Sequence, residues 1–135
     1  MRVVLDTNVL ISGLFWRGTP YRILSAWRDG RFVLAVTPEI LAEYVDVARR
    51  LAENFPGVDV SRLLELLAVT AKVYEPFALP GPVCSDPADD KFLACALAAG
   101  AVVVSGDKHL LVVQGHRGVE VLTPAAFARI HLPPK

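Results

Sequence analysis

The sequence predicts an α/β fold, a three-layer α/β/α sandwich around a central parallel sheet of four or five strands. Short runs such as VVL (3–5) and VVV (102–104) are continuously apolar, which is typical of strands buried on both faces. Helical patterns alternate with these runs along the chain, as they do in parallel α/β proteins. The length of 135 residues is that of one ordinary domain, so we expect a single domain over residues 1–135.

The first half of the chain contains two strands and four helices in this interpretation. The pairs Thr19-Pro20 and Thr37-Pro38 each place a capping threonine before a proline, the residue favoured at the first position of a helix. Ser61 is expected to cap the fourth helix in the same way. The expected elements are a strand at 2–5, a helix at 7–15, a helix from 19 to a stop at 30, a strand at 32–36, a helix from 37 to about 54, and a helix at 62–73.

The second half begins with a proline-rich connection over residues 76–82. Asp86-Pro87 is expected to open a helix that runs through Leu97, and Gly100 to end it. Thr123-Pro124 repeats the threonine and proline signal for a last helix. The two strands of this half are expected at 101–104 and 118–122.

The composition excludes several classes of protein. Hydrophobic residues make up 53% of the chain, yet the longest unbroken run of apolar residues or glycine, Phe92 to Val104, is well short of the roughly 18 residues that span a membrane. Met1 and Arg2 lead straight into a strand pattern rather than a signal peptide, so we expect a cytoplasmic protein. Cys84 and Cys95 have no CxxC or histidine spacing, so we expect packing residues rather than a zinc site.

The charges are balanced, with 14 basic and 14 acidic residues, so no strongly basic surface indicates a nucleic-acid partner. If nucleic acid is the substrate, a local patch or a bound metal ion must supply the positive charge. The acidic residues therefore decide the functional interpretation.

Two aspartates follow predicted strands. Asp6 comes directly after the first strand, and Asp107 follows the strand at 101–104. Their side chains would converge if those strands are neighbours, because ligands of parallel sheets gather beyond the carboxyl ends of the strands. The alternative is that each aspartate is only a helix cap or a turn residue.

Glu43 lies on the long helix that begins at residue 37. At about 100° per residue, the apolar residues of this helix fill one arc, and Glu43 is the acid nearest its edge. An acid at the edge of a buried face can reach over the sheet. The alternative is an ordinary surface glutamate.

The segment SDPADDKFLACALAAG (85–100) contains three acids, each of which can either stabilise the start of a helix or belong to a functional site. Asp86 precedes Pro87 as a helix cap, and Asp89 lies where a carboxylate favours the helix dipole. Asp90 needs neither role, and its spacing to Leu93 places it on the apolar side of the helix. We therefore expect Asp90 to be functional and Asp86 to be auxiliary.

Four carboxylates would thus gather, those of Asp6, Glu43, Asp90 and Asp107. They would repel one another strongly unless a cation lay among them. Oxygen ligands without histidine or cysteine indicate Mg²⁺ or Mn²⁺. Such an ion supports the hydrolysis of phosphodiester bonds.

The motifs resemble the PIN domain family, in particular its small prokaryotic branch of VapC-like toxin ribonucleases. The matching pieces are LDTNVL (5–10), the inward Glu43, DPADDKFLACALAAGA (86–101), VVVSGDKHLL (102–111) and VEVLTPAAF (119–127). The resemblance implies a metal-dependent ribonuclease that acts on single-stranded RNA. It carries the catalytic and metal-binding acids onto Asp6, Glu43, Asp90 and Asp107, with Asn8 and Ser105 as supporting residues.

On this basis, Asp6, Asp90 and Asp107 would hold one or two Mg²⁺ or Mn²⁺ ions. Glu43 would complete the site or orient the attacking water, leaving 5′-phosphate and 3′-hydroxyl ends. The family also implies an antitoxin protein as partner and a homodimer, and the high apolar content agrees with self-association.

The basic residues near the predicted site in sequence are candidates for phosphate contacts, although single positive charges are more often solvated. These candidates are Arg17, Arg22, Lys91 and Lys108. His109, two residues after Asp107, is a candidate general acid, but we favour the interpretation that it is a surface or packing histidine.

Two other enzyme classes fit less well, and one alternative remains. A haloacid-dehalogenase-type phosphatase needs a second aspartate where Asn8 stands, and no GxGxxG dinucleotide motif follows the first strand. The alternative is a PIN-like module that binds RNA or protein without cutting it. The presence of all four acids favours catalysis.

Overall fold

The computed structural model describes residues 1–132, so the last residues of the predicted domain 1–135 lie outside the described part. Within this part the chain forms a five-stranded sheet with the order β3-β2-β1-β4-β5. All neighbouring strands are parallel, which confirms the predicted fold class. The strands are β1 (Arg2–Leu5), β2 (Val33–Val36), β3 (Lys72–Val73), β4 (Val102–Val104) and β5 (Val121–Leu122).

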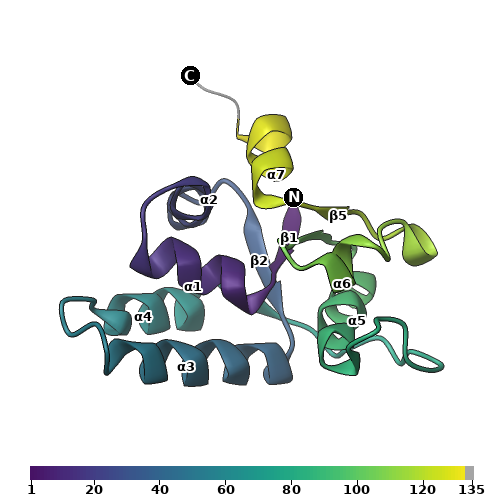
Figure 1. Cartoon of the computed structure of the whole chain (residues 1–135), viewed down its shortest axis with the longest axis horizontal. Coiled ribbons are helices and arrows are strands. Elements are labelled where there is room, and N and C mark those ends of the chain that lie inside the picture. Colours follow the sequence, from purple (N-terminus) through teal and green to yellow (C-terminus); the bar gives the residue numbers. More distant parts are fainter. Residues whose placement is uncertain (133–135) are drawn as a thin grey trace.

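The helices cover both faces of this sheet. In Figure 1, α1 to α4 lie on one side of the sheet and α5 and α6 on the other. Helix α5 packs against β1, β2 and β4. The helices are α1 (Thr7–Phe15), α2 (Thr19–Arg28), α3 (Pro38–Ala52), α4 (Val60–Thr70), α5 (Asp90–Ala99), α6 (Lys108–Leu111) and α7 (Pro124–His131), with 3₁₀ turns η1 (Pro87–Asp89) and η2 (His116–Gly118).

The strand order reverses beside β1. The chain first adds β2 and β3 on one side of β1, and then crosses to add β4 and β5 on the other side. Leu5 therefore pairs with Val104, and the carboxyl ends of β1 and β4 are adjacent. A reversal of this kind opens a crevice at the carboxyl ends of the strands.

The core anchors α3 to the end of β1. Tyr44 is fully buried, and its hydroxyl donates a hydrogen bond to the carbonyl oxygen of Leu5. Leu5 is itself fully buried, so this bond is shielded from water. Because Glu43 precedes Tyr44 on α3, the bond also brings Glu43 close to the end of β1.

The predicted helix starts are partly confirmed. Thr37 and Thr123 cap α3 and α7 through their side chains, and a proline follows each of them as expected. The prediction for Thr19 was wrong, because Thr19 is the first residue of α2 and Gly18, with φ 132°, occupies the cap position. Glycine adopts this φ without the strain that a side chain would add.

The predictions for residues 59–73 need a larger correction. Asp59 caps α4 by accepting a hydrogen bond from the amide of Ser61, so Ser61 is not the cap. The helix ends at Thr70 rather than at Val73. Val73 instead pairs with Val36 of β2, since the sheet edge offers hydrogen bonds that the local pattern does not reveal.

No helix among residues 1–132 combines the length and the apolar character needed to cross a membrane.

Candidate metal centre at the ends of the central strands

Asp6 and Asp107 meet at the carboxyl ends of β1 and β4. Asp6 is 4% exposed and caps α1, with its Oδ1 accepting a hydrogen bond from the amide of Val9 at 2.9 Å. The amide of Asp6 donates to the carbonyl oxygen of Val104 at 3.0 Å, so the backbone at the site continues the β1–β4 pairing.

Ser105 links the two aspartates. It is fully buried, its hydroxyl donates to Oδ2 of Asp6, and its oxygen accepts a hydrogen bond from the amide of Asp107 at 2.9 Å. Asp107 in turn caps α6 by accepting a hydrogen bond from the amide of His109 at 2.8 Å. The orientation of both carboxylates is thus set by hydrogen bonds.

Glu43 enters the same pocket from α3. One of its oxygens accepts a hydrogen bond from the hydroxyl of Thr7, and Oε1 lies 2.9 Å from Nζ of Lys91. Glu43 therefore reaches from α3 over the end of the sheet. The pocket has a volume of about 230 Å³ and is lined by Asp6, Thr7, Asn8, Glu43, Val47, Ala88, Asp89, Lys91, Phe92 and Asp107.

The expectation for Asp90 requires a correction. Asp90 does not line this pocket, and its carboxylate accepts hydrogen bonds from the amides of Val83 and Cys84, at 2.7 Å from the latter. Asp90 therefore shapes the loop that precedes η1. Asp89, which we had assigned to helix-dipole stabilisation, lines the acidic pocket instead.

The local structure before α5 explains why Asp89, and not Asp90, lines the pocket. Residues 87–89 form a 3₁₀ turn, and α5 begins only at Asp90. At the first position of α5, the carboxylate of Asp90 is drawn to the amides of Val83 and Cys84 in the preceding loop. The sequence carried a signal for Asp89, because it precedes Phe92, Leu93 and Ala96 by three, four and seven residues, and these three are buried.

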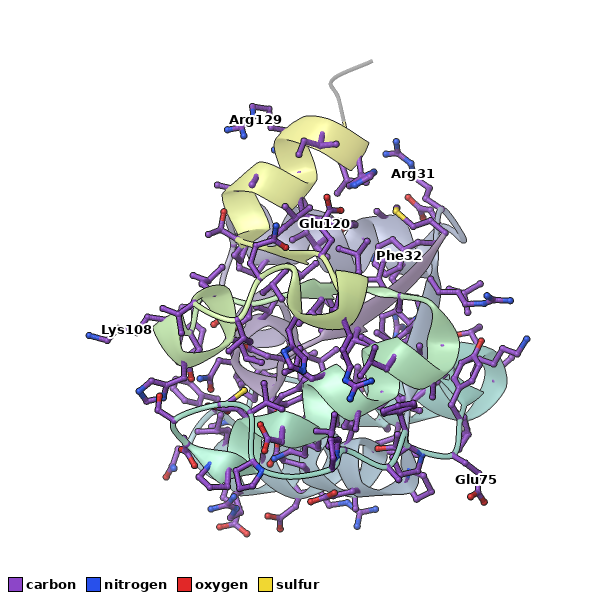
Figure 2. All side chains as sticks on the ribbon, turned by 90° about the vertical axis from the view of Figure 1, so that its right-hand side faces the viewer. Arg31, Phe32, Glu75, Lys108, Glu120 and Arg129 are labelled. Carbon is purple, nitrogen blue, oxygen red and sulfur yellow. The ribbon has the colours of Figure 1, made fainter. Side chains whose placement is uncertain are left out.

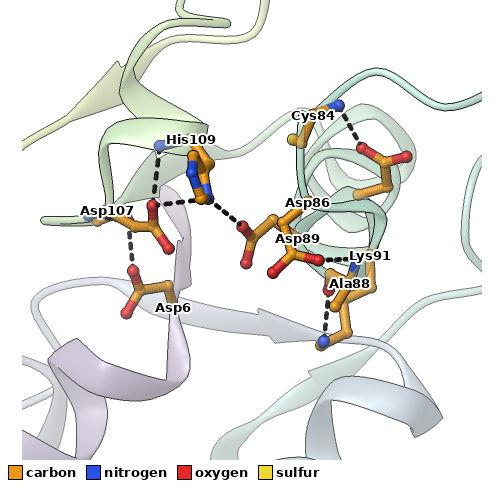
Figure 3. A network of polar contacts seen from close by, with 10 residues as sticks. Asp6, Cys84, Asp86, Ala88, Asp89, Lys91, Asp107 and His109 are labelled. Carbon is orange, nitrogen blue, oxygen red and sulfur yellow. Dashed lines mark hydrogen bonds and ion pairs between the residues drawn. The ribbon is translucent and has the colours of Figure 1, made fainter.

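Asp86 and His109 border the site. Asp86 caps η1 through the amide of Ala88 at 3.0 Å, as its cap prediction required. Nδ1 of His109 lies 3.6 Å from carboxylate oxygens of both Asp89 and Asp107 (Figure 3). Atoms of Asp86, Asp89 and His109 that can bind a metal lie within 4.8 Å of one another. The structure thus brings His109 to the site, whereas we had favoured a surface or packing histidine.

The electrostatics of the pocket suit a cation. Burial raises the pKa of Asp6, and the charge of Asp107 adds to this effect. Burial likewise raises the pKa of Asp89, followed by the charges of Asp107 and Asp86. Among residues 1–132, Oδ2 of Asp89 is buried without a hydrogen-bond partner. A buried carboxylate oxygen that accepts no hydrogen bond and lies beside other carboxylates fits a hard cation such as Mg²⁺ or Mn²⁺.

The other candidate residues are dispersed. Asn8 is exposed at the mouth of the pocket. Arg17 lies over the ring of Tyr21, and Arg22 donates to the carbonyl oxygen of Leu132 at 3.0 Å. Lys108 is exposed and extends from the surface (Figure 2). Of the four basic candidates, only Lys91 lines the acidic pocket.

Two comparisons with known proteins bear on the family of this chain. Residues 2–109 match a family model described as PIN domain. The chain is also 31% identical over 119 residues to an uncharacterized protein of Methanocaldococcus jannaschii, MJ1680, a match that covers 82% of this chain and 74% of the relative.

Proposed function

This chain belongs to the PIN domain family, and from that premise we propose that it is a metal-dependent endoribonuclease that hydrolyses phosphodiester bonds of single-stranded RNA. The observation that carries the proposal is the meeting of Asp6, Glu43, Asp89 and Asp107 in one pocket at the strand ends. Asp89 takes the place in this set that the sequence had given to Asp90.

Asp6, Asp89 and Asp107 are the residues that would hold the ion, Mg²⁺ or Mn²⁺. These acids supply only oxygen ligands, which both ions accept. When bound, such an ion stabilises charge that develops on phosphoryl oxygens and makes water more nucleophilic.

The chain's own residues prepare the site for hydrolysis. Ser105 and the amide of Val9 hold the carboxylate of Asp6 in one orientation. Glu43, held by Thr7, faces the same pocket, where it can accept a hydrogen bond from the attacking water. Asn8, at the mouth, offers amide groups to the RNA. Attack by water leaves 5′-phosphate and 3′-hydroxyl ends.

The test is cleavage of a labelled single-stranded RNA with Mn²⁺, Mg²⁺ or EDTA. We expect cutting with either ion and none with EDTA, and we expect Asp6→Asn and Asp107→Asn to abolish it. Asp46→Asn is the matched control, because Asp46 pairs with Arg50 on the exposed side of α3 and does not line the pocket.

Two outcomes would contradict the proposal. RNA that is bound but not cut with either ion would favour a non-catalytic binding module. Cleavage that is blocked by 2′-deoxy substitution at the cut and that yields cyclic phosphates would identify the RNA's 2′-hydroxyl as the nucleophile instead of water.

The proposal extends to the toxin of a toxin-antitoxin pair that forms a homodimer. The resemblance to VapC-like ribonucleases supports this extension, as do exposed apolar side chains such as Trp16 and Val69. Expression of the chain should arrest growth, and a small partner protein should relieve the arrest. Harmless overexpression would contradict the toxin role, and a monomer in light scattering would contradict the homodimer.

A further inference from the structure

Lys91 is a lysine largely buried inside an acidic pocket. Its side chain is 11% exposed, whereas lysine side chains are rarely buried unless they are paired. Nζ lies 2.9 Å from Oε1 of Glu43 and donates to the carbonyl oxygen of Ala88 at 2.6 Å. It also lies 5.1 Å from the centre of the Phe92 ring, within the range of a cation–π contact.

The local structure gives no reason for a cation at this position. Lys91 is the second residue of α5, and the positive end of the helix dipole disfavours a cation in the first turn. Burial of an ammonium group also carries a desolvation penalty. The nearby carboxylates are what makes the position favourable.

The four acids of the pocket fall into two groups. Both oxygens of Glu43 already have partners in the chain, namely Thr7 and Lys91. Asp89 differs, because its Oδ2 is buried and has no hydrogen-bond partner among residues 1–132. Asp6 and Asp107 lie with Asp89 in the remainder of the pocket.

A second divalent ion would compete with Lys91 for Glu43. Nζ of Lys91 already lies 2.9 Å from Oε1 of Glu43, so a second ion bound by this carboxylate would lie close to the ammonium group, and the two cations would repel each other. With one divalent ion, the four carboxylates and the ammonium group of the pocket keep one net negative charge, whereas a second ion would leave a net positive charge beside Lys91.

We propose that Lys91 takes the place of a second metal ion: its ammonium group pairs with Glu43 and restricts the site to one divalent ion, bound by Asp6, Asp89 and Asp107. This inference rests on the proposed function, since it concerns the same metal centre. Lys91 is a positioning residue for Glu43 in this arrangement.

The test counts Mn²⁺ ions bound to the full chain without RNA, by electron paramagnetic resonance of free Mn²⁺ during a titration. We expect one ion for the wild type and none for Asp6→Asn. Lys91→Met should bind two ions, because it frees Glu43 and removes the competing charge. Lys91→Arg should retain one ion, as should Lys72→Met, a control that removes an exposed lysine outside the pocket.

A double variant tests the role of Glu43. Lys91→Met with Glu43→Gln should return the count to one, because the second ion needs the freed carboxylate. Lys91→Gln serves as a second neutral variant if Lys91→Met does not fold, with folding checked by circular dichroism.

The outcomes separate the two proposals. No bound ion in the wild type would overturn the metal centre and the proposed function with it. Two ions in the wild type would overturn only the role of Lys91, and so would one ion in folded Lys91→Met or Lys91→Gln.

Discussion

Helices α1 and α4 both begin at a capping aspartate, and the two aspartates differ in their surroundings. Asp6 caps α1 and Asp59 caps α4, each by accepting a hydrogen bond from a backbone amide of its helix. Asp6 is buried, and burial raises its pKa. Asp59 is exposed, and hydrogen bonds from Ser61 lower its pKa.

The difference shows that the capping motif determines where a helix begins, while the tertiary environment determines the chemistry of the cap. Asp6 lies at the end of a central strand, next to Asp107 and away from water. A carboxylate in this environment binds a proton or a cation more readily than one on the surface.

The same contrast separates two adjacent residues. Burial raises the pKa of Asp89, which faces the pocket. Burial also acts on Asp90, but hydrogen bonds from Cys84 and Val83 outweigh it and lower the pKa. Among residues 1–132, Oδ2 of Asp89 therefore has no hydrogen-bond donor, whereas hydrogen bonds stabilise Asp90 as an anion.

The largest effect is expected when Asp89 and Asp90 are replaced one at a time and the rate of RNA cleavage is measured. Asp89→Asn should lower the cleavage rate at least about a hundredfold, since even residues that only support metal ligands contribute up to this much. Asp90→Asn should retain cleavage and lose about 1 kcal/mol of the free energy of unfolding, because the amides keep only a neutral acceptor. Urea denaturation measures the second effect, and the reverse pattern of activities would show that Asp90 is the ligand.

The next effect concerns Asp6, the buried cap of α1, and is measured as the stability of the protein with Mn²⁺ and in EDTA. Mn²⁺ at a hundred times its dissociation constant should stabilise the wild type by about 2.7 kcal/mol, and Asp6→Asn should lose this gain.

Because the folded-state pKa of Asp6 is raised, its contribution to stability is lost as pH rises through that pKa. In EDTA at neutral pH, Asp6→Asn should therefore unfold at no lower temperature than the wild type, since asparagine also caps helices. A lower melting temperature of the variant in EDTA would contradict this.

The smallest effect concerns Asp59, the exposed cap of α4, and the pH dependence of the protein's stability. The pKa of Asp59 is lowered from 3.8, so its contribution to stability is present above that value and is lost as pH falls through the folded-state pKa. The wild type should thus be slightly more stable than Asp59→Asn near neutral pH, and the difference should vanish in acid. Melting temperatures across the acidic range measure it, and a difference that persists below the folded-state pKa would show that charge is not its cause.

Much of the fold was predictable because its signals are local. Apolar runs indicated β1, β2 and β4, and the threonine and proline pairs correctly marked the starts of α3 and α7. The short strand β3 was missed, because Lys72 and Val73 become a strand only by pairing with β2.

The sequence by itself determined the α/β class, the family and which acidic residues were available to the site. Only the tertiary structure decided which carboxylate oxygens meet, since Ser105 reaches Asp6 across 99 residues and Thr7 reaches Glu43 across 36. The short turn before α5 likewise decided between Asp89 and Asp90. The physical reason is that a side chain's direction depends on the backbone within one turn, while its partners depend on contacts between distant segments.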